Sequence, residues 1–125
     1  MIKLPPLRKV IVESPFKATF ERTQEQHKQY LLRCLEDCYR RGESPFASHL
    51  YAPEVLHDDI PEERTLGIES AWVWAYDADA IAVYTDLGIS PGMQHSISHY
   101  KENIPDIPIE RRTIDWALVR AILEY

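Results

Sequence analysis

One segment of the chain, residues 80–93, constrains the fold more than any other. Its first five residues are apolar and include β-branched side chains, which is typical of a buried strand. A polar turn follows, and Ser90 with Pro91 then has the pattern of an N-cap and the first position of a helix. A strand, a turn and a helix in this order leave a helix N-terminus beside the strand end, where it can hold an anion or a sugar hydroxyl.

The rest of the chain alternates strands and helices in the same way. Four segments are predicted as strands: residues 9–13, 46–50, 80–84 and, because of its proline, as an edge strand, 107–111. Four are predicted as helices: residues 20–41, 61–75, 91–101 and 116–122. Residues 51–60 are predicted as a loop. The alternation predicts an α/β three-layer sandwich around a parallel sheet of four or five strands.

The composition narrows the class of protein. A length of 125 residues suits a single domain, residues 1–125. The net charge of −6 disfavours a nucleic-acid duplex as partner, because phosphate binding needs a basic face. No apolar run approaches the ~20 residues of a membrane helix, and the first residues lack the apolar stretch of a secretory signal, so we expect neither. Cys34 and Cys38 lie one helical turn apart, so we expect buried thiols in a reducing cytoplasm and no metal site.

Polar residues follow three of the predicted strands at the point where each ends. Ligand sites in open parallel sheets lie beyond the carboxyl ends of the strands, so we expect these residues to meet at one rim. They are Glu13, Ser14 and Pro15 after the first strand, His49 and Tyr51 after the second, and Asp86 and Ser90 after the third.

Two of these residues have both a structural and a functional interpretation. Glu13 can accept hydrogen bonds from ribose hydroxyls, or act as an acid or base if burial raises its pKa. It can equally cap the loop amides after Pro15. His49 is either a hydrogen-bonded structural histidine or a catalytic one.

The helix that starts at Pro61 brings further charged candidates. We expect one of Asp58 and Asp59 to cap this helix and the other to remain free, and a magnesium site would need more oxygen ligands than the segment offers. Arg64 is predicted either to pair with an acidic neighbour (Glu63, Asp59 or Asp86) or to bind a nucleotide phosphate through its planar fork.

A glycine, a lysine and a group of aromatic residues also have both a structural and a functional interpretation. Gly92 either allows close backbone packing or lets a phosphate or sugar approach its N–H. Lys17, in the loop after the first strand, is predicted to be solvated, with attraction of an anion as the alternative. Trp72, Trp74 and Tyr76 cannot all be buried on one helical face, so we expect one of them to contact a partner subunit.

Four segments, in this order, resemble an uncharacterised domain family of phages and bacteria that is related to the nucleoside 2-deoxyribosyltransferases. They are residues 13–16 (ESPF), 47–51 (ASHLY), 58–68 (DDIPEERTLGI) and 83–93 (VYTDLGISPGM). The resemblance implies a flavodoxin-like fold, a pocket for a nucleoside or nucleotide, and homo-oligomers in which a neighbour can complete the site. A bacterial or phage-infected host cytoplasm follows from the same resemblance. Neither a GxGxxG nor a Walker sequence is present, so we expect no dinucleotide cofactor.

The chain differs from the transferases at the residue that reacts with the substrate. In the transferases a glutamate four residues after the glycine attacks the deoxyribose, and counting from Gly92 gives Ser96 here. A pair of Ser96 with His99 at i+3 is one substitute, and the carboxylates of Glu13, Asp58 or Asp59 are others, with Glu13 favoured. The expected binding residues are Ser14, Pro15, His49, Tyr51, Asp58, Arg64, Asp86, Ser90, Gly92, Met93 and Ser96.

These observations lead to one functional hypothesis with two alternatives. The chain is expected to bind a nucleoside or nucleotide and to cleave or exchange an N-glycosidic bond, with Glu13 as the reacting carboxylate. The first alternative is a module that sequesters a nucleotide without chemistry. The second is a protein-interaction domain on the same scaffold, which would have its rim plugged by side chains instead of open.

Overall fold

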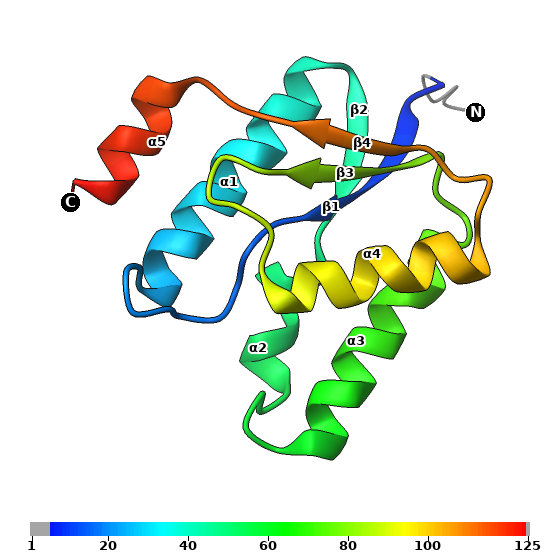
Figure 1. Cartoon of the computed structure of the whole chain (residues 1–125). Helices are drawn as coiled ribbons and strands as arrows, with labels where there is room; N and C mark the ends of the chain where they lie inside the picture. The colour runs from blue at the N-terminus through cyan, green and yellow to red at the C-terminus, as the bar shows by residue number, and fades with distance from the viewer. Residues whose placement is uncertain (1–5, 125) are drawn as a thin grey trace, which may run out of the picture.

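The computed structural model describes residues 6–124 and consists of alternating strands and helices (Figure 1). The elements in chain order are β1 (Arg8–Glu13), α1 (Gln24–Arg40), β2 (Glu43–Phe46), the 3-10 turn η1 (Ser48–Leu50), α2 (Ala52–Val55), α3 (Pro61–Ala75), β3 (Ala80–Tyr84), α4 (Pro91–Asn103), β4 (Ile109–Arg112) and α5 (Trp116–Leu123). Within this part of the chain, none of the helices combines the length and the apolar character needed to cross a membrane.

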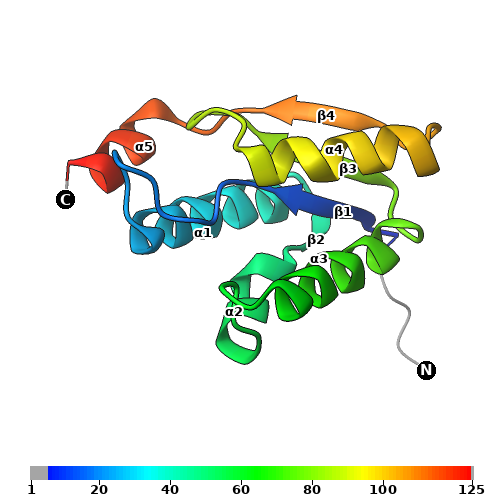
Figure 2. The ribbon, with the colours of Figure 1, turned by 60° about the horizontal axis from the view of Figure 1, so that its bottom comes forward.

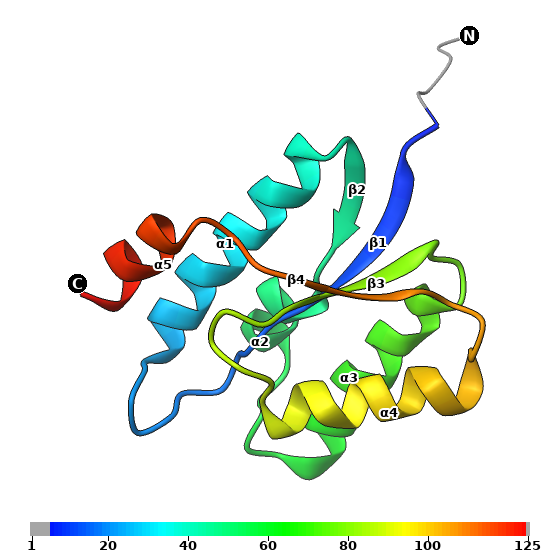
Figure 3. The same cartoon turned by 45° about the horizontal axis from the view of Figure 1, so that its top comes forward.

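The four strands form one parallel sheet in the order β2-β1-β3-β4. Helices α1 and α5 lie on one side of this sheet and α3 and α4 on the other, as Figures 2 and 3 show from two further directions. The predicted three-layer α/β sandwich with a parallel sheet is confirmed, and its topology is flavodoxin-like.

Alternate residues of the central strands supply the two halves of the core, because successive side chains of a strand point to opposite faces. Val10 and Val12 of β1 pack with α1 and α5, whereas Ile11 packs with α3 and α4. Strand β3 is buried along its whole length, as its apolar sequence predicted. Cys34 and Cys38 are free thiols in the α1 half of the core.

Several predicted bounds were wrong. The fourth strand, predicted at residues 107–111, is Ile109–Arg112. Helix α1 begins at Gln24, not near residue 20, because Thr23 forms a capping box with Gln26. The second strand was predicted at residues 46–50 but β2 ends at Phe46, and the chain then turns through η1. A short helix, α2, occupies part of the predicted loop. Pro45 lies within β2, which is an edge strand and tolerates proline because one side of its backbone has no partner.

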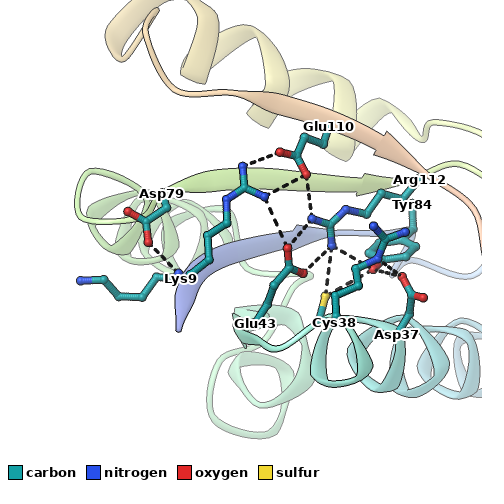
Figure 4. A network of polar contacts seen from close by, with 10 residues as sticks. Lys9, Asp37, Cys38, Glu43, Asp79, Tyr84, Glu110 and Arg112 are labelled. Carbon is teal, nitrogen blue, oxygen red and sulfur yellow. Dashed lines mark hydrogen bonds and ion pairs between the residues drawn. The ribbon is translucent and has the colours of Figure 1, made fainter. Parts of the chain in front are cut away.

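A network of ion pairs ties the strands together on the α1 side of the sheet (Figure 4). The guanidinium of Arg112 in β4 donates to both carboxylate oxygens of Glu43 in β2, each at 2.7 Å. It also donates to Glu110 at 2.7 Å, and Glu110 accepts a second guanidinium, that of Arg8 in β1. Tyr84 adds a hydroxyl close to Arg112. Ion pairs therefore join β1, β2 and β4, and the hydrogen bond to Tyr84 adds β3.

Candidate functional site

A cavity of about 480 Å³ opens beyond the carboxyl ends of β1 and β3, bounded by α2, α3 and the start of α4. The chain leaves the carboxyl end of β1 towards α1 on one side of the sheet and leaves the carboxyl end of β3 towards α4 on the other side, so the two connections diverge here. Such a topological switch point is where open α/β sheets bind ligands. The volume lies in the range of small-molecule sites.

Glu13, the last residue of β1, lines the cavity and has one hydrogen-bonded partner in the described chain. The hydroxyl of Tyr100 in α4 donates to its Oε2 at 2.8 Å. Burial raises the pKa of Glu13 to about 7, and the Tyr100 bond offsets part of that rise. Burial and the adjacent carboxylate also raise the pKa of Tyr100, so this hydroxyl stays protonated.

Ser14 and His49 form a second polar pair in the cavity wall. Ser14 follows Glu13, and its Oγ lies 2.7 Å from Nε2 of His49 in η1. Burial lowers the pKa of His49 to about 4, so the imidazole is neutral at pH 7. The pair joins the end of β1 to the turn after β2, which is the hydrogen-bonded role expected for a structural histidine.

The N-terminus of α4 forms another part of the wall. Ser90 is its N-cap, as predicted, and its Oγ accepts a hydrogen bond from the backbone N–H of Met93 at 3.2 Å. Met93 itself is buried, and its side chain joins the core beneath the cavity. Beside Gly92, the position of a Cβ atom would have only the Ser90 hydroxyl, 4.0 Å away, as a neighbour. A ligand could therefore approach the backbone at Gly92 closely.

Charged groups from α3 and from the loop before it complete the wall of the cavity. Nη1 of Arg64 donates to both carboxylate oxygens of Asp58 at 2.9 Å, so the predicted partners Glu63, Asp59 and Asp86 were wrong. Neither aspartate caps the helix, because Ile60 occupies the N-cap without a side-chain bond. Both members of the Arg64–Asp58 pair line the cavity.

Ser96 has a different partner from the one predicted. Its Oγ accepts a hydrogen bond from Nε1 of Trp72 in α3 at 3.2 Å. His99, the candidate base, stacks on the Trp72 ring with centroids 3.6 Å apart and planes at 11°. The Ser96–His99 pair is therefore absent from the described structure, and Ser96 has no base beside it there.

Nine of the twelve predicted site residues line the cavity: Glu13, Ser14, His49, Asp58, Arg64, Ser90, Gly92, Met93 and Ser96. The other three lie outside it. Asp86 turns towards α1 and accepts a hydrogen bond from Tyr30 at 2.6 Å and others from the N–H of Ile114. Tyr51 packs against Phe46, and Pro15 is buried behind the wall.

Sequence reasoning missed Tyr100 and Trp72 as members of the wall, whereas Lys17, considered there as a solvated residue or an anion-attracting one, lines it. Tyr100 lies four residues after Ser96 and seven after Met93, so helical periodicity alone places it on the same face. Trp72 was considered only as an interface residue, and nothing in the sequence signals its contact with α4. Within residues 6–124 no group of three or more His, Cys, Asp or Glu side chains is arranged to hold a metal ion.

Residues 8–112 match a family described as Domain of unknown function (DUF7768). The chain belongs to this family. The DUF7768 match runs from the first residue of β1 to the last of β4, so it includes the whole sheet and every residue of the cavity wall. No curated protein and no solved structure matched the chain.

Proposed function

We propose that the cavity binds a nucleoside or nucleotide and that the protein cleaves or exchanges its N-glycosidic bond, with Glu13 as the reacting carboxyl group. The observation that carries this proposal is the position of Glu13: half-buried, at the switch point, lining the cavity, with a pKa of about 7. Perturbed carboxyl groups of this kind concentrate at catalytic sites. The resemblance of residues 83–93 to the nucleoside 2-deoxyribosyltransferases supports the same chemistry.

A carboxyl group with this pKa suits N-glycosidic cleavage. When the C1′–N bond breaks, its electron pair leaves with the base and positive charge develops on the sugar. Ionised Glu13 stabilises that charge or attacks C1′, while its protonated form can donate a proton to the departing base. Water or a second base then takes the place of the first at C1′. Tyr100 holds one carboxylate oxygen and leaves the other for the ligand.

The remaining wall groups suit the other parts of a nucleotide. The backbone at Gly92 is accessible at the start of α4, where the helix dipole favours an anion or a sugar hydroxyl. Lys17 and Arg64 carry positive charge at the same cavity. Ser14 and His49 offer a hydroxyl and a neutral ring as hydrogen-bonding groups.

Product analysis tests the enzyme directly. The protein is incubated with deoxynucleosides or their 5′-monophosphates and a second free base, and the products are separated by chromatography. We expect base release or exchange that falls at least about a hundredfold in Glu13→Gln, since a positioned acid–base group contributes on that scale. Asp59→Asn, an exposed carboxylate outside the cavity, is the matched control and should retain activity. Absence of release, or release that does not depend on Glu13, contradicts the proposal.

One observation favours a second candidate, a nucleotide-binding module without chemistry. At the position of the transferase nucleophile stands Ser96, whose hydroxyl is engaged by Trp72. This candidate predicts stabilisation of the fold by one class of nucleotide, about 2.7 kcal/mol at a hundredfold excess over Kd. It also predicts no product. Unchanged melting curves across a nucleotide panel would eliminate it.

We also propose that the chain forms a homo-oligomer. Trp74 and Tyr76 at the end of α3 are 57% and 53% exposed, and aromatic residues are enriched at protein interfaces. Light scattering after gel filtration gives the mass directly. A monomer at every concentration tested contradicts this part of the proposal.

A further inference from the structure

We infer that the flat ring of the ligand packs on the indole of Trp72, so that the site recognises a nucleobase or a similar heteroaromatic ring in addition to the sugar. This inference rests on the proposed function and names the group that selects the ligand. It assigns to Trp72 a specificity role that its sequence context did not suggest.

The indole is held in place from two directions. Its Nε1 donates to Ser96 at 3.2 Å, and His99 stacks on it with planes at 11°. His95 lies near the ring as well, with centroids 5.4 Å apart and planes at 49°. A ring fixed before the ligand arrives loses little conformational entropy on binding. The part of the indole that lines the cavity is therefore a preorganised apolar wall.

Trp72 and Glu13 line the same cavity, and each is bound by a residue of α4. Ser96 and Tyr100 are four residues apart on α4 and so lie on one face of the helix. Ser96 holds Trp72, and Tyr100 holds Glu13. One face of α4 thus places an aromatic wall beside the candidate catalytic carboxyl group. In a nucleoside the base is attached directly to C1′, so both parts must be recognised by neighbouring groups.

The surroundings of Trp72 also explain what Ser96 does. Its hydroxyl satisfies the indole N–H, which is the polar atom that a partly buried tryptophan must pair. Trp74, two residues further along α3, is different: it packs on Phe46 with centroids 5.2 Å apart, is 57% exposed and lies outside the cavity wall. It provides a matched control on the same helix.

Fluorescence can report on Trp72 alone. The chain has three tryptophans, so a Trp74→Phe/Trp116→Phe variant keeps Trp72 as the only one. This variant is titrated with deoxynucleoside 5′-monophosphates carrying each of the four bases and, separately, with deoxyribose 5-phosphate. Calorimetry on the same samples measures binding independently. We expect at least one nucleotide to bind and to change the Trp72 emission, and the sugar phosphate to leave the emission unchanged.

Substitutions then test whether the contact contributes to affinity. Trp72→Leu should weaken nucleotide binding about tenfold to a hundredfold, as loss of a base-stacking side chain does. Trp72→Phe should retain more affinity, and Trp74→Leu should bind like the wild type. Circular dichroism checks that each variant is folded. If Trp72→Leu does not fold, the change in Trp72 emission of the Trp74→Phe/Trp116→Phe variant on nucleotide binding tests the contact instead.

The outcomes separate the two proposals. Nucleotide binding that leaves the Trp72 emission and the Trp72→Leu affinity unchanged overturns the inference while the proposed function stands. Equal affinity for the nucleotide and for deoxyribose 5-phosphate does the same. No binding by any nucleotide overturns both.

Discussion

The sheet holds carboxyl groups in two places and surrounds them in opposite ways. On the α1 side, Glu43 and Glu110 lie among the guanidinium groups of Arg8 and Arg112 (Figure 4). At the carboxyl end of β1, Glu13 has a tyrosine hydroxyl as its partner and forms no ion pair within residues 6–124.

The difference in surroundings gives the two regions opposite electrostatics. Hydrogen bonds from Arg8 and Arg112 lower the pKa of Glu110 to about 2, whereas burial raises the pKa of Glu13 to about 7. Carboxylates that are paired with guanidinium groups keep their charge near neutral pH and link strands of the sheet. An uncompensated carboxyl group beside a cavity can change its protonation state near neutral pH, which is what acid–base chemistry requires. The comparison therefore separates charged groups that are compensated and join strands from an uncompensated carboxyl group, to which we propose a catalytic role.

The largest effect on stability is expected from Arg112→Met. The Arg112 side chain is 4% exposed, and its removal leaves the buried carboxylate of Glu43 without its bidentate partner. Breaking a buried pair from one side costs about 3–5 kcal/mol of unfolding free energy, measured by urea denaturation. Arg120→Ala is the control, because its pair with Glu124 is exposed on both sides and contributes less than about 0.5 kcal/mol. A cost below about 1 kcal/mol for Arg112→Met would show that the network is not structural.

Glu13 is expected to make the fold less stable as the pH rises. Its folded pKa of about 7 lies above the unfolded value of 4.5, so the native state binds more protons between these pH values and stability falls across them. The loss amounts to about 3 kcal/mol at 1.36 kcal/mol per pKa unit. His49, with its lowered pKa of about 4, produces a rise over pH 4–6.5 and masks part of this fall.

The difference between wild type and Glu13→Gln cancels the His49 contribution. Urea denaturation of both proteins between pH 4.5 and 8 should therefore give curves that diverge by about 3 kcal/mol, with the variant gaining relative to wild type as the pH rises. Parallel curves would mean that Glu13 titrates as an ordinary carboxyl group.

Tyr100→Phe should have a smaller effect that depends on pH. The Tyr100 hydrogen bond lowers the pKa of Glu13, so its removal should move that pKa further up. Unfolding free energy should fall by about 2 kcal/mol at pH 8, where the acceptor is charged, and by about 1 kcal/mol at pH 5. The same cost at both pH values would contradict a bond to an ionising partner.

The smallest effect is expected at the N-terminus of α4. Ser90→Ala removes the side-chain bond to the N–H of Met93 and should cost about 1 kcal/mol. Ser90→Gly should cost a few tenths of a kcal/mol, since glycine is tolerated at N-caps. Thermal denaturation can rank the two variants, and a larger loss for glycine than for alanine would show that the cap is not the cause.

The sequence predicted the residues of the cavity wall better than those of the ion-pair network. Strand ends, the Ser90 cap and the apolar run of β3 are local signals, and in a parallel sheet they also predict which residues share a rim. Nine candidates accordingly line one cavity. Asp86 lies outside the cavity, although it follows a strand end. A residue at this position can turn to either side of the sheet, and here Tyr30 and the N–H of Ile114 donate to its carboxylate.

The ion-pair network could not be predicted because its members are distant in sequence. Arg8 and Glu110 are 102 residues apart, and Arg112 and Glu43 are 69 apart. They meet only because the strand order places β1 between β2 and β3 and because long side chains cross the sheet face. The contact between Trp72 and Ser96 depends in the same way on how α3 and α4 pack.

A single titration tests the central claim most directly. With ¹³C-labelled glutamate, the side-chain carboxyl resonances of Glu13 and Glu110 are followed by NMR from pH 2 to 9 and assigned with Glu13→Gln and Glu110→Gln. We predict a midpoint near 7 for Glu13 and near 2 for Glu110, and a displacement of the Glu13 midpoint when a bound nucleotide fills the cavity. If Glu13 titrates near 4.5 with the surface carboxylates and nucleotides leave it unchanged, the account is wrong.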